Sequence, residues 1–178
     1  MSNLSEKEFI EKYVVMVYNL ALRLLGNPAD AEDLAQDSLI RALKALPKFR
    51  GDSAGFTWLY RITVNTWKNR VRYEKRRGLW KIIPLEFFSG NHDHAESSLP
   101  SEETPLDSGL ESQEKTATVQ KALLELDEES RAVVVLRDLQ NKSYGEIAEI
   151  LQIPEGTVKS RLSRARESLK ESLKKSYF

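Results

Sequence analysis

The 178-residue sequence has no cysteine, only two histidines and no long apolar run. The absence of cysteine excludes disulfides, thiolate chemistry and cysteine-ligated zinc. No stretch approaches the roughly 18 consecutive apolar residues that a membrane-spanning helix needs. The N-terminal residues are acidic and polar, whereas a secretory signal is basic and then apolar. By exclusion, these absences lead us to expect a cytoplasmic protein.

Sequence motifs of catalysis are missing as well. There is no phosphate-binding glycine loop, no G-x-S-x-G and no H-E-x-x-H. His92 and His94 form an H-x-H pair that could bind a metal, but they lie in a polar stretch without periodicity. We interpret them as solvated side chains. The sequence therefore predicts a protein that is not an enzyme and that holds no metal and no cofactor.

The balanced charge of the chain hides a strong segregation. Lys plus Arg and Asp plus Glu both number 27, which alone would argue against a nucleic-acid partner. Residues 1–85, however, carry 15 basic and 9 acidic groups, a net charge of +6. Residues 86–118 carry 1 basic and 8 acidic groups, a net charge of −7, whereas residues 119–178 carry +1. Because one half is clearly basic, nucleic-acid binding stays open.

The acidic middle of the chain predicts a linker between two domains. From residue 89 to 109 it reads SGNHDHAESSLPSEETPLDSG, without helical or strand periodicity. Such a stretch is solvated and self-repelling. We therefore expect an all-α fold of two small helical domains, residues 1–85 and 116–178, joined by an acidic flexible linker at 86–115. Each domain should have its own modest core.

Three helices are expected in the first domain. A capping box begins the first helix at Ser5, and Gly26 ends it. Asn27 then has the character of an N-cap, with Pro28 at the first helical position. The second helix has a regular apolar face: Ala31, Leu34, Ala35, Ser38, Leu39, Ala42, Leu43 and Leu46. A third helix is expected over about 56–77.

Four shorter helices are expected after the linker, and no segment alternates convincingly as a strand would. The side chains expected to face inward on the first two are Val119, Ala122, Leu123 and Leu126, then Ala132, Leu136 and Leu139. Ser143 and Glu146 form a capping box at the start of the third. The fourth has an apolar face of Val158, Leu162, Ala165 and Leu169.

A narrow basic stripe follows one side of the third helix of the first domain. Its members are Trp58, Arg61, Asn65, Lys68 and Arg72. Residues 61–81 hold 8 basic groups and 1 acidic group, and the helix interleaves its basic groups with Trp58, Tyr60, Trp67 and Tyr73. Cations and exposed aromatic rings together suit single-stranded or distorted nucleic acid, because unpaired bases stack. The alternative is that the aromatic residues belong to the core and that the basic run is a solvated face.

The strongest local signal is a helix-turn-helix between Ser143 and Leu169. Two helices are joined by a short turn that contains Gly156, and the second is rich in exposed polar side chains. Its free face offers Thr157, Lys159, Ser160, Ser163 and Arg164. Their donors suit base edges and phosphates in a major groove. The alternative is an ordinary helical hairpin with a solvated basic face.

The second helix of the first domain has an acidic side with Asp30, Glu32, Asp33 and Asp37. A carboxylate metal site is not expected there, because no histidine stands at E-x-x-H spacing and no second carboxylate helix completes a cage. Docking of another protein fits this face better.

Taken together, three segments resemble an extracytoplasmic-function sigma factor of the envelope-stress branch. They read GNPADAEDLAQDSLIRALKAL, then FRGDSAGFTWLYRITVNTWKNRVR, then LDEESRAVVVLRDLQNKSYGEIAEILQIPEGTVKSRLSRARESLKE. They cover most of both domains in the order that the family has. The resemblance implies a factor that binds core RNA polymerase, recognises −10 and −35 promoter elements and opens the −10 region.

The resemblance also assigns roles to matching residues. The acidic helix would dock on the clamp helices of the polymerase through Asp30, Asp33, Gln36, Asp37 and Arg41. The −10 element would be opened, and a flipped base captured, by Phe49, Arg50, Trp58, Arg61, Asn65, Lys68 and Arg72. The −35 element would be read by Thr157, Lys159, Ser160, Arg161, Ser163 and Arg164.

Further partners follow from the same resemblance. The second domain would rest on the polymerase flap, and the linker would pass through the basic channels of the polymerase. An anti-sigma factor is expected, and the apolar run 79–88 either folds back on the first domain or forms a surface that such a partner covers. Two other classes stay open: a regulator that recruits polymerase without melting promoters, and an adaptor that binds polymerase without DNA.

Overall fold

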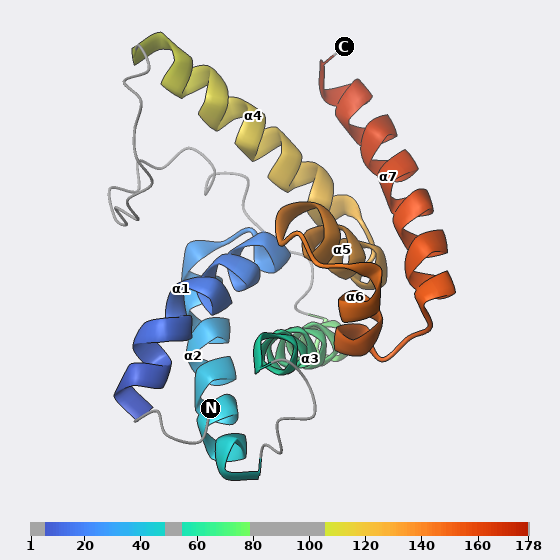
Figure 1. Ribbon diagram of the computed structural model, residues 1–178. Coiled ribbons are helices and arrows are strands. Elements are labelled where there is room, and N and C mark those ends of the chain that lie inside the picture. Colours follow the sequence, from blue (N-terminus) through green and yellow to red (C-terminus); the bar gives the residue numbers. More distant parts are fainter. Residues whose placement is uncertain (1–5, 49–54, 79–105, 178) are drawn as a thin grey trace.

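The computed structural model describes residues 6–48, 55–78 and 106–177. These residues form helices and contain no strand, which confirms the all-α prediction (Figure 1). The helices are α1 (Glu6–Leu25), α2 (Pro28–Ala45), α3 (Gly55–Arg76), α4 (Leu106–Glu125), α5 (Glu128–Val134), α6 (Tyr144–Leu151) and α7 (Glu155–Tyr177). A 3₁₀ turn, η1 (Leu46–Lys48), follows α2, and a π-helical segment, η4 (Val135–Leu139), follows α5.

The turn between α1 and α2 forms as the sequence predicts. Gly26 has φ +73°, a conformation that glycine adopts without a Cβ penalty, and its N–H donates to the Leu22 carbonyl at 2.7 Å. Asn27 then caps α2, because its side-chain oxygen accepts from the N–H groups of Ala29 and Asp30 at 2.9 and 3.3 Å. Ser5, the expected cap of α1, lies outside the described residues.

The second half contains the four expected helices, but the first of them begins earlier than predicted. Helix α4 starts at Leu106 and so includes ten residues of the segment 86–115 that was expected to be linker. A composition typical of linkers therefore did not exclude a helix.

Two of the expected inward-facing residues are exposed. Val119 and Leu139 keep 39% and 38% of their surface open to solvent. At η4 the N–H of Gln140 donates to the carbonyl of Val135 at 3.0 Å, five residues back. This wider turn shifts the side-chain positions relative to an α-helix, so the run Val133–Leu136 is buried instead of Leu139.

The buried apolar residues of the two halves are continuous, which the sequence did not predict. The largest cluster of buried apolar side chains draws on α1, α2 and α3 as well as on α4 to α7. Helix α3 packs against α6, and α1 packs against α4; Figure 1 shows α3 beneath α5 and α6. Trp67 on α3 is fully buried in this cluster. A smaller cluster around Phe9, Tyr13 and Leu59 belongs to the first half alone.

Among the described residues, no helix is long and apolar enough to cross a membrane.

Candidate nucleic-acid interface

Helix α3 exposes only part of its basic stripe. Asn65 and Arg72 are exposed, whereas Trp58, Arg61 and Lys68 are half-buried. Phe49 and Arg50 lie outside the described residues. The stripe is therefore narrower than the sequence pattern alone would make it.

The aromatic residues of α3 divide between core and surface. Trp67 and Tyr60 are buried, so for these two the core interpretation is right and stacking on bases is not. The Tyr60 hydroxyl donates to Gln140 Oε1 at 2.8 Å. Burial, and then the charge of Glu146, raise the pKa of Tyr60 to about 12. Tyr73 is 47% exposed and lies under the Arg77 guanidinium, 4.6 Å from its ring centre.

Helix α7 presents the polar face that a helix-turn-helix requires. Ser143 and Glu146 form the predicted capping box at the start of α6, with distances of 2.8 and 3.2 Å between their paired atoms. Ile147 and Leu151 of α6 are buried, and so are Val158, Leu162 and Ala165 of α7. Because one side of α7 is held in this way, its other side is free.

The predicted reading residues lie on that free side. Lys159, Ser160, Ser163 and Arg164 are exposed, while Thr157 and Arg161 are half-buried. Ser160 Oγ donates to the Thr157 carbonyl at 3.1 Å, and Arg164 Nε donates to the Ser160 carbonyl at 3.3 Å. These bonds are within α7, and they leave the exposed cation of Arg164 available to an anion from outside.

Glu129, which the sequence pattern did not single out, contacts one cation on α3 and one on α7. Lys68 Nζ of α3 donates to Glu129 Oε1 at 2.7 Å, and Arg161 of α7 forms an ion pair with Oε2. Burial raises the pKa of this carboxyl, but the hydrogen bond from Lys68 and the charges of Lys68 and Arg161 hold its pKa below the ordinary value. The two helices are thus joined through one carboxylate.

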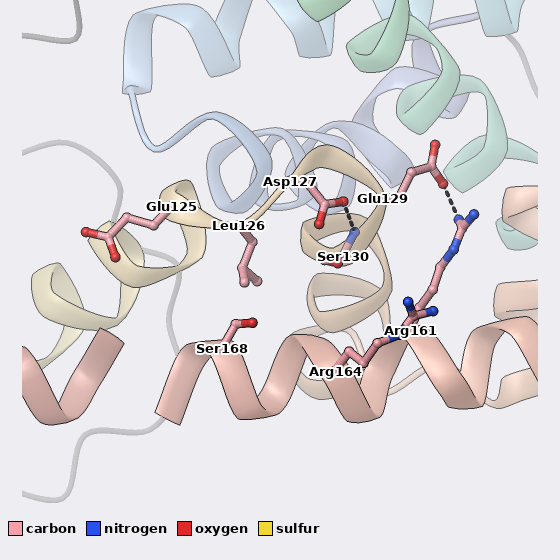
Figure 2. A pocket seen from close by; sticks show the side chains of 8 residues that line it. All are labelled: Glu125, Leu126, Asp127, Glu129, Ser130, Arg161, Arg164 and Ser168. Carbon is pink, nitrogen blue, oxygen red and sulfur yellow. Dashed lines mark hydrogen bonds and ion pairs between the residues drawn. The ribbon is translucent and has the colours of Figure 1, made fainter. Parts of the chain in front are cut away.

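A polar pocket of about 520 Å³ lies beside this ion pair, between the start of α5 and α7 (Figure 2). Arg161 and Arg164 line it from α7, and Asp127 lines it from the α5 cap, where it accepts the N–H of Ser130 at 2.9 Å. Burial raises the pKa of Asp127, but the hydrogen bonds that it accepts from Ser130 outweigh burial and hold the pKa below its ordinary value. The pocket mixes cations with carboxylates, so it does not resemble a dedicated phosphate site.

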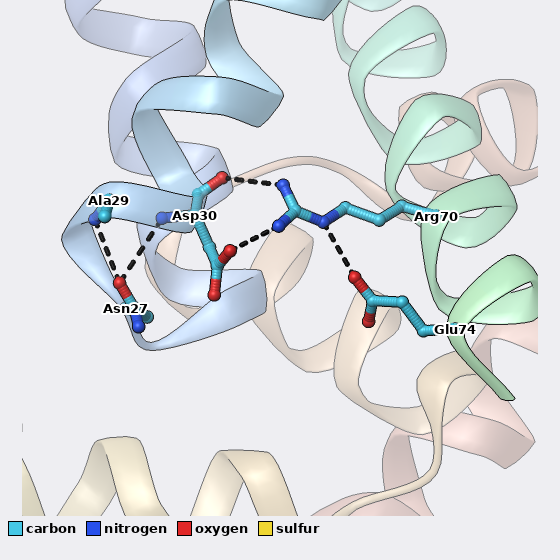
Figure 3. A network of polar contacts seen from close by, with 5 residues as sticks. All are labelled: Asn27, Ala29, Asp30, Arg70 and Glu74. Carbon is cyan, nitrogen blue, oxygen red and sulfur yellow. Dashed lines mark hydrogen bonds and ion pairs between the residues drawn. The ribbon is translucent and has the colours of Figure 1, made fainter. Parts of the chain in front are cut away.

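The acidic side of α2 is open, except at Asp30. Asp33, Gln36, Asp37 and Arg41 are exposed. Asp30 instead pairs with Arg70 of α3, whose Nη1 also donates to the Asp30 carbonyl at 3.3 Å (Figure 3). Arg70 Nε donates to Glu74 at 2.9 Å. Burial lowers the pKa of Arg70, yet its bond to Glu74 and the charges of Asp30, Glu74 and Asp33 raise it overall. Asp30 therefore helps to fix α3 on α2.

No group of three or more potential metal ligands occurs within residues 6–48, 55–78 and 106–177. His92 and His94 lie outside these ranges.

Comparison with known families assigns both halves. Residues 9–77 match the model of Sigma-70 region 2, and residues 116–169 match that of Sigma-70 region 4. Among curated proteins, the RNA polymerase sigma-H factor of Pseudomonas aeruginosa is 39% identical over 91% of this chain and 82% of its own length. The chain belongs to the extracytoplasmic-function sigma factors.

Other relatives agree with this assignment. The ECF RNA polymerase sigma-E factor of Escherichia coli K12 is 37% identical over 90% of this sigma factor and 82% of its own length. The ECF RNA polymerase sigma factor SigW of Bacillus subtilis is 34% identical over 94% of this chain and 88% of its own length. The family resemblance seen in the sequence is confirmed: this sigma factor is a transcription initiation factor that acts with RNA polymerase on promoter DNA.

Solved structures support the fold of the whole sigma factor. The sigma factor RpoE of Bartonella quintana, in complex with the anti-sigma factor NepR, matches with a TM-score of 0.69 and 26% identity, over 94% of this chain and 96% of its own. CnrH, in complex with the cytosolic domain of CnrY, matches with a TM-score of 0.63 and 25% identity, over 96% of this chain and 90% of its own. Helices α1–α3 thus form region 2, and α4–α7 form region 4.

Proposed function

We propose that this sigma factor reads the −35 element with α7 and opens the −10 element with α3. The observation that carries this proposal is the free face of α7. Lys159 and Arg164 are exposed on a helix whose opposite face is buried against α5 and α6. Arg and Lys bind phosphates and guanine edges, while Ser160 and Ser163 can contact either a base or the backbone. Thr157 and Arg161 flank the same face.

For the −10 element, we assign the stripe of α3 together with the loop before it. Asn65 is exposed near the middle of the helix and can pair with the edge of a base. Unstacking a base costs a few kcal/mol, so neighbouring cations must offset that energy. The residues assigned to this step are Phe49, Arg50, Trp58, Arg61, Asn65, Lys68 and Arg72.

For core polymerase, we assign the acidic side of α2 to the clamp helices. Asp33, Gln36, Asp37 and Arg41 are exposed and carry both signs of charge, which suits a specific protein surface. Asp30 takes part at the edge of this surface while it holds Arg70.

We further assign residues 1–85 and 116–178 to the two functional domains, with 86–115 as the acidic segment that passes through polymerase. Region 4 rests on the polymerase flap, and the factor works in the cytoplasm. An anti-sigma factor is the proposed regulator. Of the two structural relatives, RpoE is bound to the anti-sigma factor NepR, and CnrH is bound to the cytosolic domain of CnrY. The run 79–88 is a proposed part of that contact.

The test is reconstituted transcription. The purified chain is mixed with bacterial core RNA polymerase and genomic DNA, and the 5′ ends of the transcripts are mapped. Discrete starts that share two spaced upstream elements, absent without the chain, support the proposal. Asn65→Ala should reduce opening of duplex promoters about tenfold or more, whereas the matched variant Asn19→Ala, at an exposed position on α1, should not. Random initiation with an active core would favour a regulator that does not melt promoters.

A further inference from the structure

Helix α7 carries one more exposed cation beyond the proposed reading residues. Arg166 follows Ser163 by three positions and Lys159 by seven, so these three side chains share one stripe of the helix. The Arg166 side chain keeps 53% of its surface exposed. It lies one turn past the residues expected to contact base edges, because a recognition helix reads bases with its N-terminal end.

Asp138 of η4 holds the Arg166 guanidinium at two points. Arg166 Nε donates to Asp138 Oδ2 at 3.1 Å, and Arg166 Nη2 forms a second hydrogen bond with Oδ1. Two parallel bonds between a guanidinium and a carboxylate fix the plane of the guanidinium as well as its position. The direction in which Arg166 points is therefore set by a residue on another element.

The π-helical turn of η4 brings Asp138 beside α7. Val135 and Leu136 of this segment are buried, whereas Asp138 is exposed. The neighbouring cation, Arg137, donates through Nη1 to the Lys142 carbonyl at 2.8 Å. Arg137 is thus held at the next turn, and Asp138 pairs with the cation of α7. Such π-helical turns are rare and often lie at functional sites.

The pair with Asp138 leaves the outer edge of Arg166 available. A guanidinium has five N–H donors. Asp138 accepts from Nε and from one N–H of Nη2, so the N–H groups of Nη1 and the second one of Nη2 remain. Among residues 6–48, 55–78 and 106–177, no second acceptor of Arg166 is present. The remaining donors form the flat fork that matches two oxygens of a phosphate.

The place of Arg166 along α7 favours a phosphate over a base. Lys159 and Arg166 are seven residues apart, which is about 10 Å along a helix. This length is close to the width of the major groove, about 12 Å. With Lys159 at the base edges, Arg166 therefore comes to the edge of the groove, where the backbone of one strand runs.

We infer that Arg166 binds a backbone phosphate at the edge of the −35 element and that Asp138 positions it for this contact. This inference rests on the proposed function, to which it adds a phosphate contact and a positioning residue. A side chain already held in its binding conformation loses less freedom on binding. Asp138 thus strengthens DNA binding, although its own charge repels DNA.

The first experiment measures how tightly holoenzyme, assembled from the full chain and core polymerase, binds duplex promoter DNA. A mapped promoter carries one neutral methylphosphonate at a time in place of the phosphates in and around the −35 element. With the parent chain, one such replacement should weaken binding about tenfold, because it removes a hydrogen-bonded ion pair. Arg166→Gln should bind the unmodified promoter about tenfold more weakly and should lose nothing further at that position. The matched control is Lys174→Gln, which removes a cation from an exposed position farther along α7 and should respond to the replacement as the parent does.

The second experiment separates positioning from charge. Removal of a carboxylate near DNA ordinarily strengthens binding, because repulsion is lost. For Asp138→Asn we expect the opposite, about threefold weaker binding, since Arg166 must then be ordered when DNA binds. Asp138→Glu, which keeps a carboxylate, should restore most of the affinity. The control Glu149→Gln removes the charge from an exposed position of α6 and should bind at least as tightly as the parent.

Circular dichroism verifies that each variant is folded. If Asp138→Asn does not fold, Arg166→Lys, which keeps the charge but cannot form both bonds to Asp138, is measured in its place with the same expectation. The inference is overturned if no methylphosphonate position distinguishes Arg166→Gln from the parent. It is equally overturned if Asp138→Asn, or the variant that replaces it, binds as tightly as the parent, because the pair would then be only a structural contact within region 4.

The inference and the proposed function can fail separately. If the variants of Arg166 and Asp138 bind like the parent while charge reversal at Lys159 and Arg164 abolishes binding to the −35 element, the proposed function is supported and the inference is contradicted. If the charge reversal also leaves binding unchanged, α7 does not read the −35 element, and both are contradicted.

Discussion

The two helices assigned to promoter reading differ in how much of them is open. On α7 the side chains of Lys159, Ser160, Ser163 and Arg164 are exposed. On the described part of the α3 stripe only Asn65 and Arg72 are. Each helix packs against three others: α3 lies against α1, α2 and α6, and α7 lies against α4, α5 and α6. The proposed −10 surface is thus more covered in this structure than the proposed −35 surface.

The largest effect is expected at Trp67, where the two regions share their core. Trp67→Ala should lower the free energy of unfolding by about 3–5 kcal/mol, because a fully buried ring leaves a cavity. Trp58, which is only partly buried beside the smaller cluster, serves as the control, and Trp58→Ala should lower it by about 1 kcal/mol. Denaturant unfolding gives both values. Equal losses would contradict a core shared between the regions.

Reversal of two charges on α7 should have the next largest effect. Lys159→Glu with Arg164→Glu replaces attraction to DNA by repulsion and should reduce promoter-specific transcription about 100-fold or more. The double variant Lys174→Glu with Lys175→Glu carries the same change at the exposed far end of α7 and should lose much less. Run-off transcription from a mapped promoter compares them. An unaffected Lys159/Arg164 variant would favour an adaptor that does not touch DNA.

At α3 the change Asn65→Ala should act on opening rather than on binding. We expect initiation on duplex promoters to fall about tenfold or more, since a lost hydrogen bond to a captured base removes part of the energy that offsets unstacking. On a template with a pre-opened −10 region the loss should be small. Abortive transcription from the two templates measures the ratio. A similar loss on both templates would contradict a role in melting.

Acidic pH should slightly weaken the contact between region 4 and region 2. The groups around Glu129 are Lys68 on α3, Arg161 and Arg164 on α7, Glu125 on α4 and Asp127 at the N-cap of α5. The pKa of Glu129 is lowered from 4.5 while region 4 packs on region 2. The carboxylate therefore stabilises this packing fully above the pKa that it has when the regions are apart. The stabilisation is lost as pH falls through the lower pKa of the packed chain. Energy transfer between a dye on α1 and a dye on α7 should therefore decrease below about pH 4.5, where protonation removes the carboxylate charge that pairs with Lys68 and Arg161. Glu129→Gln should lack this part of the decrease, and an identical titration in both chains would contradict the assignment.

Local features could be predicted from the sequence because they depend on neighbours a few residues apart. The caps at Asn27 and Ser143, the apolar face of α2 and the free face of α7 all follow from spacing along one helix. The family resemblance rested on the same segments and was confirmed by the relatives.

Features that join distant parts of the chain could not be predicted in this way. Glu129 looks like an ordinary acidic residue in the first turn of α5, and nothing nearby in sequence indicates Lys68. Arg131 is a charged residue that is buried because four backbone carbonyls receive its donors. Trp67 lies on α3 next to the basic stripe, and its ring is buried in a cluster that draws on both regions.

The most direct test compares the free chain with the chain in a transcription complex. Cysteines introduced at the exposed positions Glu11 and Glu171 take a donor and an acceptor dye. Energy transfer between the dyes is measured in the chain alone, and then in the open complex with core polymerase and a mapped promoter. We predict high energy transfer in the free chain and near-zero transfer in the complex, because the two elements are about 85 Å apart on DNA. Unchanged high transfer in complexes that initiate normally would show that the arrangement of the free chain reads promoters, which would contradict the account.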